Sequence, residues 1–275
     1  MKFGLFSLNH DACSYPDGIR AVARRAEELG YESLWAGDHI VLPDPWQAPA
    51  PLKPEERLLE PVVALTFAAA VTERLLLGTG VIILPQRQPL VLAKQLASLD
   101  VLSKGRLLVG IGVGYLEPEF KALGVTLAER ARRTDDYLGA MQAIWTQAPA
   151  SFESDFVSFS GVSASPRPDQ RPLPLVMGGY HRATYRRSVQ MARSWYGFAM
   201  TPEKLVKHLE GLKEAADRYQ RPPELGKLEI TVTPRELAEG DLERYAAMGV
   251  DRVVLYPPRA VPLQELLEFV ETNAP

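Results

Sequence analysis

Apolar and polar residues follow two alternating patterns along the chain. Short runs that are almost entirely apolar predict strands buried on both faces, at residues 2–8, 32–36, 74–84, 106–114, 174–179, 195–200, 227–232 and 252–257. After each run, apolar residues spaced three or four apart predict a helix, at residues 16–30, 61–72, 89–103, 128–145, 181–194, 201–219, 241–249 and 262–272. The pattern is therefore a repeat of one strand followed by one helix.

Eight consecutive strand–helix units indicate an α/β fold, a (β/α)8 barrel of the TIM type. A doubly wound open sheet is the alternative, but the segment SLNHDACSYPDG after the first strand lacks the glycine-rich phosphate motif of that fold. Two insertions interrupt the repeat, the proline-rich residues 43–61 and residues 149–173, where SFESDFVSFSG predicts a small hairpin. We expect residues 1–275 to form a single barrel domain.

Composition narrows the classes of function. The chain of 275 residues has a net charge of −3, which gives no electrostatic footprint for nucleic acid or for an anionic membrane. No apolar run reaches the length of a membrane span, and the N-terminus is predicted to be a strand rather than a signal peptide. Cys13 is the only cysteine, which excludes an intramolecular disulfide and a cysteine metal cluster. We expect a cytoplasmic protein without a metal site.

Candidate chemistry collects where the predicted strands end, because the active sites of such barrels lie at the carboxyl ends of the strands. Asn9 and His10 follow the first strand, and Asp38 and His39 follow Gly37 after the second. The next three strand ends are rich in glycine: Thr79, Gly80 and Val81; Gly112, Gly114 and Tyr115; and Gly178, Gly179 and Tyr180. Glycine in a strand marks close approach of a ligand or of backbone. We expect a flat ligand across the barrel mouth, although small residues also let a barrel taper.

Three segments together resemble the luciferase-like flavin and deazaflavin oxidoreductases: SLWAGDH, RLLLGTGVIILPQRQPLVLAKQLASLDVLSKGRLLVGIGVGYLEPEFKALG and LPLVMGGYHRATYRR. The resemblance is narrower to the short members that use coenzyme F420. It implies a TIM-type barrel, a homodimer, and an enzyme that transfers a hydride between F420 and a small carbonyl, alkene, imine or alcohol. An FMN-dependent monooxygenase of the same fold and a barrel that binds a flavin without turnover are the alternatives.

The resemblance also implies where the cofactor binds. A non-proline cis peptide at Gly80–Val81 is expected beside the ring, and Gly178, Gly179 and Tyr180 match the family's phosphate-binding turn. The full set of expected cofactor-binding residues is Asp38, His39, Thr79, Gly80, Val81, Gly112, Gly114, Gly178, Gly179 and Tyr180. His181, Arg186 and Arg187 follow the phosphate turn, and we interpret them as surface residues of a helix rather than phosphate ligands.

His39 is the expected catalytic residue. In deazaflavin-dependent relatives the Asp-His dipeptide lies beside the reactive face of the ring, and imidazole suits proton transfer because its pKa is ordinarily close to neutral. Asp38 is expected to contact the polar edge of the ring or to tune His39, although adjacent strand residues point to opposite faces, so a direct pair requires irregular backbone. His10 is the second candidate for the proton donor. A packing role for His39 is the simpler alternative.

Departures from the family pattern bear on the substrate. Tyr115 stands where some sugar-phosphate dehydrogenases of the superfamily carry a glutamate, with Glu117 and Glu119 after it, which argues against a sugar phosphate. The segment SWYGFAM also lacks the Asp-Gly-Trp that is often found there. A moderately apolar substrate is indicated by aromatic residues that could equally belong to the core: Phe6, Trp46, Trp195 and Phe198.

Overall fold

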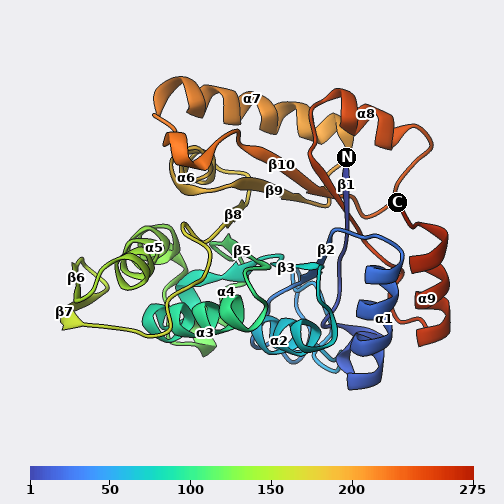
Figure 1. Ribbon diagram of the computed structural model, residues 1–275, viewed down its shortest axis with the longest axis horizontal. Coiled ribbons are helices and arrows are strands. Elements are labelled where there is room, and N and C mark those ends of the chain that lie inside the picture. Colours follow the sequence, from blue (N-terminus) through green and yellow to red (C-terminus); the bar gives the residue numbers. More distant parts are fainter.

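The computed structural model describes residues 1–275, in which eight parallel strands close into a barrel surrounded by helices (Figure 1). The barrel strands are β1 (Lys2–Leu5), β2 (Ser33–Ala36), β3 (Leu76–Thr79), β5 (Leu107–Gly112), β8 (Leu175–Gly178), β9 (Ser194–Phe198), β10 (Glu229–Thr233) and β11 (Arg252–Leu255). The ring closes because β11 pairs with β1 and β3 pairs with β5. The predicted (β/α)8 barrel is confirmed, whereas a single domain over the whole chain stays a prediction.

Helices follow the strands and cover the outside of the barrel, as Figure 1 shows. They are α1 (Pro16–Glu28), α2 (Pro61–Val71), α3 (Pro89–Leu102), α4 (Glu117–Ala122), α5 (Arg130–Thr146), α6 (Arg182–Met191), α7 (Pro202–Arg218), α8 (Asp241–Ala247) and α9 (Leu263–Thr272). Most of them begin and end within a few residues of the predicted positions. None is long and apolar enough to cross a membrane.

Three helices begin with the same local device, a polar N-cap side chain followed by proline at the first helical position. Glu60 caps α2, Gln88 caps α3 and Thr201 caps α7, and each side chain accepts a hydrogen bond from the backbone N–H three residues later, at 2.8, 2.7 and 3.4 Å. Proline fits the first turn because its missing N–H would have no helical partner there. These starts are fixed by local sequence alone.

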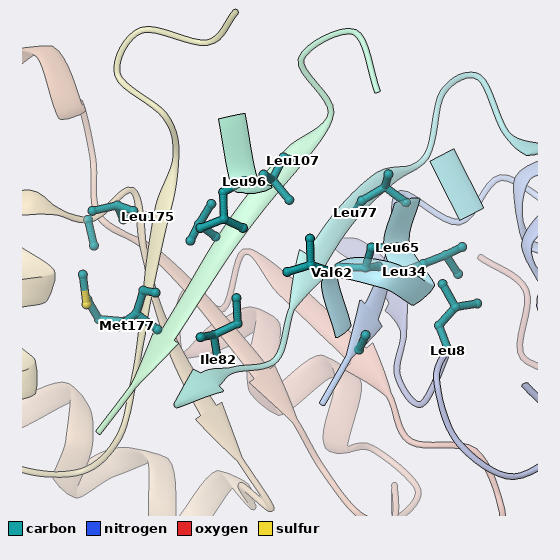
Figure 2. Packing of buried hydrophobic residues seen from close by; sticks show 14 of the residues in the cluster. Leu8, Leu34, Val62, Leu65, Leu77, Ile82, Leu96, Leu107, Leu175 and Met177 are labelled. Carbon is teal, nitrogen blue, oxygen red and sulfur yellow. The ribbon is translucent and has the colours of Figure 1, made fainter. Parts of the chain in front are cut away.

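The hydrophobic core has two layers, one inside the barrel and one between the strands and the helices. The inner layer is a small cluster of Phe6, Trp35, Leu108, Val176, Tyr196 and Val254. The outer layer is much larger, and Figure 2 shows strand residues such as Leu34 and Leu77 close to Leu65 of α2. Each fully buried leucine contributes about 1.5–3 kcal/mol. With both faces covered, most strand residues are apolar, as the sequence indicates, although Ser33, Thr231 and Arg252 are buried among them.

The third predicted strand, residues 74–84, differs from the structure. It divides into β3 and a short continuation, β4 (Ile82–Ile83), on either side of the Gly80–Val81 peptide, which is cis as the resemblance implies. The first strand ends at Leu5 rather than at residue 8, and α4 and the 3-10 turn at Asp11–Ser14 were not predicted. Apolar residues occur in bulges and turns as well as in strands, so the hydrophobic pattern did not predict where these strands end or divide.

The two insertions occupy different ends of the barrel. Of the first insertion, residues 43–60 follow β2 and contain no helix or strand apart from an isolated bridge between Leu58 and His10, and Pro61 begins α2. Residues 149–173 follow α5 and contain the antiparallel hairpin of β6 (Ala150–Glu153) and β7 (Ser158–Val162), which projects beside α5 in Figure 1. The predicted hairpin is confirmed. Only the first insertion lies on the side of the barrel where the strands end.

Candidate active site

A cavity of about 410 Å³ opens at the carboxyl ends of the barrel strands. All of the residues expected to bind the cofactor line it except Thr79. Thr79 is fully buried, and its hydroxyl donates to the carbonyl of Gly110 at 2.8 Å and accepts from the Gly110 N–H at 2.7 Å. Thr79 therefore joins β3 to β5, and the structure gives it no face toward the cavity.

The side chain of Val81 occupies the room that two of the strand-end glycines leave. A Cβ atom on Gly112 would lie 2.6 Å from Val81 Cγ2, and one on Gly178 would lie 2.9 Å from Val81 Cγ1. Because real Cβ contacts are longer, neither position accepts a side chain while Val81 keeps its place. Packing of Val81 thus accounts for these glycines, and Val81 itself forms part of the cavity wall.

His39 is held by a buried carboxylate that comes from α4. The Nδ1 atom of His39 lies 2.8 Å from Oε2 of Glu119, whose side chain is 0% exposed, and Oε1 of Glu119 accepts from the backbone N–H of Ile40 at 2.6 Å. Burial acts to raise the pKa of Glu119, but the hydrogen bonds from His39 and Ile40 and the charge of His39 outweigh it and lower the pKa below its usual range.

The ionisation of Glu119 fixes the orientation of the imidazole. An ionised carboxylate only accepts hydrogen bonds, so the proton between the two side chains belongs to Nδ1 of His39. The other ring nitrogen, Nε2, has no protein partner, and His39 lines the cavity. The ring of Tyr115 meets the imidazole edge-on, with centroids 5.9 Å apart. This arrangement leaves Nε2 as the only imidazole nitrogen available for proton transfer, while the bond from Nδ1 to Glu119 fixes the position of the ring.

Asp38 does not pair with His39. Its Oδ1 atom accepts from Nη2 of Arg87 at 2.6 Å, and its Oδ2 atom accepts from the backbone N–H of Ile83 at 2.9 Å. Burial raises the pKa of Asp38, against the opposing charge of Arg87, which also bonds Glu60 at 2.7 Å. Asp38 thus ties the end of β2 to β4 and to the cap of α2, and both of its oxygens are already used.

His10 also reaches the cavity, but acidic residues surround it. Its Nδ1 atom lies 2.8 Å from Asp11 and its Nε2 atom lies 3.7 Å from Glu56, in the insertion of residues 43–61. Burial lowers the pKa of His10 although the nearby carboxylates oppose this effect. Glu56 in turn pairs with Arg259. His10 therefore helps to fasten the insertion over the mouth, whereas His39 presents a free nitrogen there.

The turn before α6 has the form expected of an anion-binding site. Gly179 has a φ of +126°, and the backbone N–H groups of Tyr180 and His181 donate no hydrogen bond within the protein. The indole of Trp195 donates to the Gly179 carbonyl at 2.9 Å, and the Tyr180 hydroxyl bonds the backbone of Phe198. The turn is therefore held rigidly, and its free N–H groups and the helix dipole favour a negative charge.

Arg186 and Arg187 of α6 have structural roles. Arg187 is 2% exposed, and both it and Arg186 pair with Asp135 of α5, at 2.8 and 2.9 Å. Our interpretation of Arg187 as a solvated helix charge is wrong, because one turn of α6 faces α5 rather than solvent. His181 is exposed and accepts weakly from the Ala183 N–H at 3.5 Å as the N-cap of α6, so it is a surface residue as predicted.

Aromatic side chains form one wall of the cavity. Phe6, Phe198 and Tyr256 touch one another, with ring centroids 5.4 to 5.7 Å apart, and all three line the cavity. Trp195 is fully buried beneath the phosphate-type turn and belongs to the core. Trp46 is half exposed and lies outside the lining. Of the four aromatic residues that the sequence associates with an apolar substrate, only Phe6 and Phe198 therefore line the cavity.

Sequence reasoning missed three groups that shape the site: Glu119, Arg87 and Arg235. In the sequence, Glu119 stood out only as a residue after Tyr115, and the pattern that could have indicated its role was a carboxylate following a glycine-rich strand end.

A second cavity of about 620 Å³ lies at the opposite end of the barrel. Most of its charged side chains pair with each other, as Arg193 does with Glu229, and that end of a TIM barrel serves stability.

Similarity to known proteins agrees with this architecture. The chain is 34% identical over 271 residues to an uncharacterised protein of Mycobacterium tuberculosis, a match that covers 94% of this chain and 92% of the relative. A shorter match, 35% identical over 111 residues, links 39% of this chain to 31% of the FMNH(2)-dependent dimethylsulfone monooxygenase of Pseudomonas putida.

Solved structures share the barrel. The monooxygenase RslO1 from Streptomyces bottropensis superposes with a TM-score of 0.76 at 22% identity, covering 100% of this chain and 98% of the other. An F420-dependent secondary alcohol dehydrogenase gives a TM-score of 0.74 at 17% identity, covering 98% and 97%. Such identities show the fold alone. Residues 1–243 match the sequence profile of the luciferase-like monooxygenases, and the chain belongs to that family.

Proposed function

We propose that the protein is an F420-dependent oxidoreductase that transfers a hydride between the deazaflavin and a small carbonyl, alkene, imine or alcohol. The observation that carries the proposal is the His39–Glu119 pair, 2.8 Å apart, at the edge of a largely apolar cavity. A hydride transfer to or from such a substrate requires a partner that moves a proton, and an oriented imidazole performs this role at neutral pH.

The residues of the cavity fit a flat cofactor with a phosphate. A volume of about 410 Å³ lies within the range of small-molecule sites. We assign the ring to the wall of Gly80, Val81, Gly112 and Gly178, and the phosphate to the free N–H groups of the turn before α6. When bound, the deazaflavin supplies or accepts the hydride. Asp38 acts here as a positioning residue, because both of its oxygens are engaged.

His39 has a defined part in this proposal. Glu119 keeps the proton on Nδ1, so Nε2 is the atom that gives a proton to the substrate or takes one from it. The negative charge of Glu119 stabilises the imidazolium that forms when Nε2 accepts a proton. Closure by the insertion of residues 43–61, which contributes Pro51, Leu52 and Leu58 to the lining, keeps water away from the reacting groups.

FMN is the second candidate cofactor, favoured by the match to an FMNH(2)-dependent monooxygenase. To distinguish the two cofactors, the purified protein is titrated with F420 and with FMN under identical conditions, and binding is measured by fluorescence and calorimetry. Tighter binding of F420 supports the proposal. Tighter binding of FMN redirects it to oxygen-dependent chemistry, and binding of neither refutes a redox function for the cavity.

His39→Ala tests the catalytic assignment. Among acceptors reduced by F420H2, the variant should lose about 10²- to 10⁴-fold in kcat while its affinity for F420 changes little. Lys213→Ala, at an exposed position on α7 outside the cavity lining, is the control for turnover and should keep wild-type kcat. Unchanged turnover in His39→Ala would show that the imidazole has only a packing role.

A homodimer and a cytoplasmic location complete the proposal, on the strength of the family resemblance. The sequence of α2, PVVALTFAAAV, is apolar except for Thr66, yet Val63 is 65% exposed. The neighbouring helix α3 exposes Val91 to 57%. Because a helix that is apolar on all sides is normally buried, we infer that a second copy of the chain covers this face of α2 and α3.

A further inference from the structure

Arg235 is a free cation at the edge of the candidate active site. It follows β10, lines the cavity, and forms no hydrogen bond or ion pair with any other residue of the protein. Its guanidinium carbon lies 5.5 Å from the ring centre of Phe198 and 5.8 Å from that of Tyr256. Stacking on two rings limits the conformations of the side chain while leaving all five N–H donors available.

The other arginine in the lining is already committed. Arg259 pairs with Glu56 and donates to the carbonyl of Pro51 at 3.3 Å, so its charge is neutralised within the protein. The carboxylates at the site are committed as well, Glu119 to His39 and Asp38 to Arg87. The cavity lining therefore has one charge without a partner in the protein, and this charge, on the exposed Arg235, is positive.

We propose that Arg235 binds the carboxylate of the substrate, and that the substrate is a small carboxylic acid with an apolar or aromatic body. This inference rests on the proposed function. The aromatic wall of Phe6, Phe198 and Tyr256 lies directly beside Arg235 and provides the surface for that body. Guanidinium and carboxylate are planar groups that form two parallel hydrogen bonds, which aligns the substrate as well as attracting it.

The position of Tyr115 relates this anchor to the chemistry. Tyr115 lines the cavity and touches His39, and the charges of both Glu119 and Arg235 act on its hydroxyl group in opposite senses. Arg235, Tyr115 and His39 thus line the same cavity. An acid anchored at Arg235 therefore occupies the same cavity as His39, whose Nε2 has no partner in the protein.

A carboxylate is favoured over a phosphate dianion because Arg235 stands alone. No lysine lines the cavity. The anion-binding turn before α6 follows β8, whereas Arg235 follows β10, and β9 lies between these two strands in the barrel. A single guanidinium that packs on aromatic rings neutralises one negative charge, as on a carboxylate, rather than two. Carboxylates also occur on the glutamyl tail of the deazaflavin, so the experiment must separate a substrate acid from a cofactor acid.

The probes are cinnamate and cinnamamide, which share a body and differ in charge. Calorimetry measures their binding to the wild-type protein, Arg235→Gln, Arg235→Lys and the control Arg24→Gln, each with and without F420. We expect the wild type to bind cinnamate about ten- to a hundredfold more tightly than cinnamamide. Arg235→Gln should abolish that preference, Arg235→Lys should keep part of it, and Arg24→Gln, an exposed arginine on α1, should leave it unchanged.

Several outcomes overturn the inference. Equal binding of the two probes to the wild type, no binding of cinnamate at millimolar concentration, or a full preference in Arg235→Gln would each do so. A loss of F420 affinity in Arg235→Gln with unchanged cinnamate binding would assign the arginine to the cofactor tail. Because the probes are also measured without F420, a failure of the proposed cofactor leaves the acid preference measurable by itself.

Discussion

Replacement of Glu119 tests whether the carboxylate behind His39 controls the imidazole. In the native protein Oε2 holds Nδ1 of His39 at 2.8 Å and Oε1 holds the backbone N–H of Ile40 at 2.6 Å. Glu119→Gln keeps the shape of the side chain. Because the amide oxygen is required by Ile40, the NH2 group faces Nδ1, and two donors would then meet. The imidazole should therefore move its proton to Nε2, so that Nδ1 accepts a hydrogen bond from the new amide group.

The cost to stability follows from the two hydrogen bonds. Each hydrogen bond to a buried charged group contributes about 1.5–3 kcal/mol, and the Glu119 carboxylate accepts two of them. We expect Glu119→Ala to lose about 3–5 kcal/mol, and Glu119→Gln, which keeps the bond to Ile40, to lose about 1–2 kcal/mol. At about 2–4 °C per kcal/mol for a chain of this size, the alanine variant should melt about 6–20 °C lower.

Glu119→Gln should lower turnover while the protein remains folded. Loss of the correct tautomer in Glu119→Gln should lower kcat by about 10- to 10³-fold, less than or equal to the loss in His39→Ala. Nitrogen NMR of labelled histidine reads the tautomer directly, and the chain has only four histidines, which makes assignment practical. Nδ1–H in the wild type and Nε2–H in Glu119→Gln are expected. The same tautomer and the same kcat in both proteins would refute the reasoning.

The contribution of the Glu119 carboxylate to stability should also depend on pH in the acid range. The pKa of Glu119 is lower in the folded protein than its ordinary value of about 4.3. A depressed pKa contributes stability that is fully present above the unfolded value and is lost as the pH falls through the folded value. The difference in unfolding free energy between the wild type and Glu119→Gln should therefore be constant near neutrality and shrink below about pH 4. A difference that grows with acid would contradict this sign.

Three further predictions concern other parts of the molecule. Gly112→Ala should cost about 1–3 kcal/mol in urea unfolding, because its Cβ would lie 2.6 Å from Val81; unchanged stability would mean that Val81 moves aside freely. Arg187→Met should cost about 1–3 kcal/mol without weakening F420 binding, because Asp135 keeps its pair with Arg186; weaker F420 binding at equal stability would restore a phosphate role. Val63→Glu should yield a monomer in sedimentation while Val206→Glu, on exposed α7, leaves the dimer intact; equal masses for the two variants would remove α2 from the interface.

The sequence by itself determined the architecture. Apolar runs buried on both faces and intervening helical periods are repeated along the chain, and each is a local property that packing then reinforces. The starts of α2, α3 and α7 are encoded within a few residues by a cap and a proline. Placement of His39 at the barrel mouth followed from the same logic, because the fold puts every strand end on one side.

Only the tertiary structure decided which side chains meet. Glu119 is 80 residues from His39 and Arg87 is 49 residues from Asp38, and nothing in the local pattern around either acid reports its partner. The same holds for Val81, whose side chain explains glycines on two other strands, and for Arg187, which a neighbouring helix buries. Periodicity records which face of an element is covered, whereas the pairing of charges depends on contacts between elements that are distant along the chain.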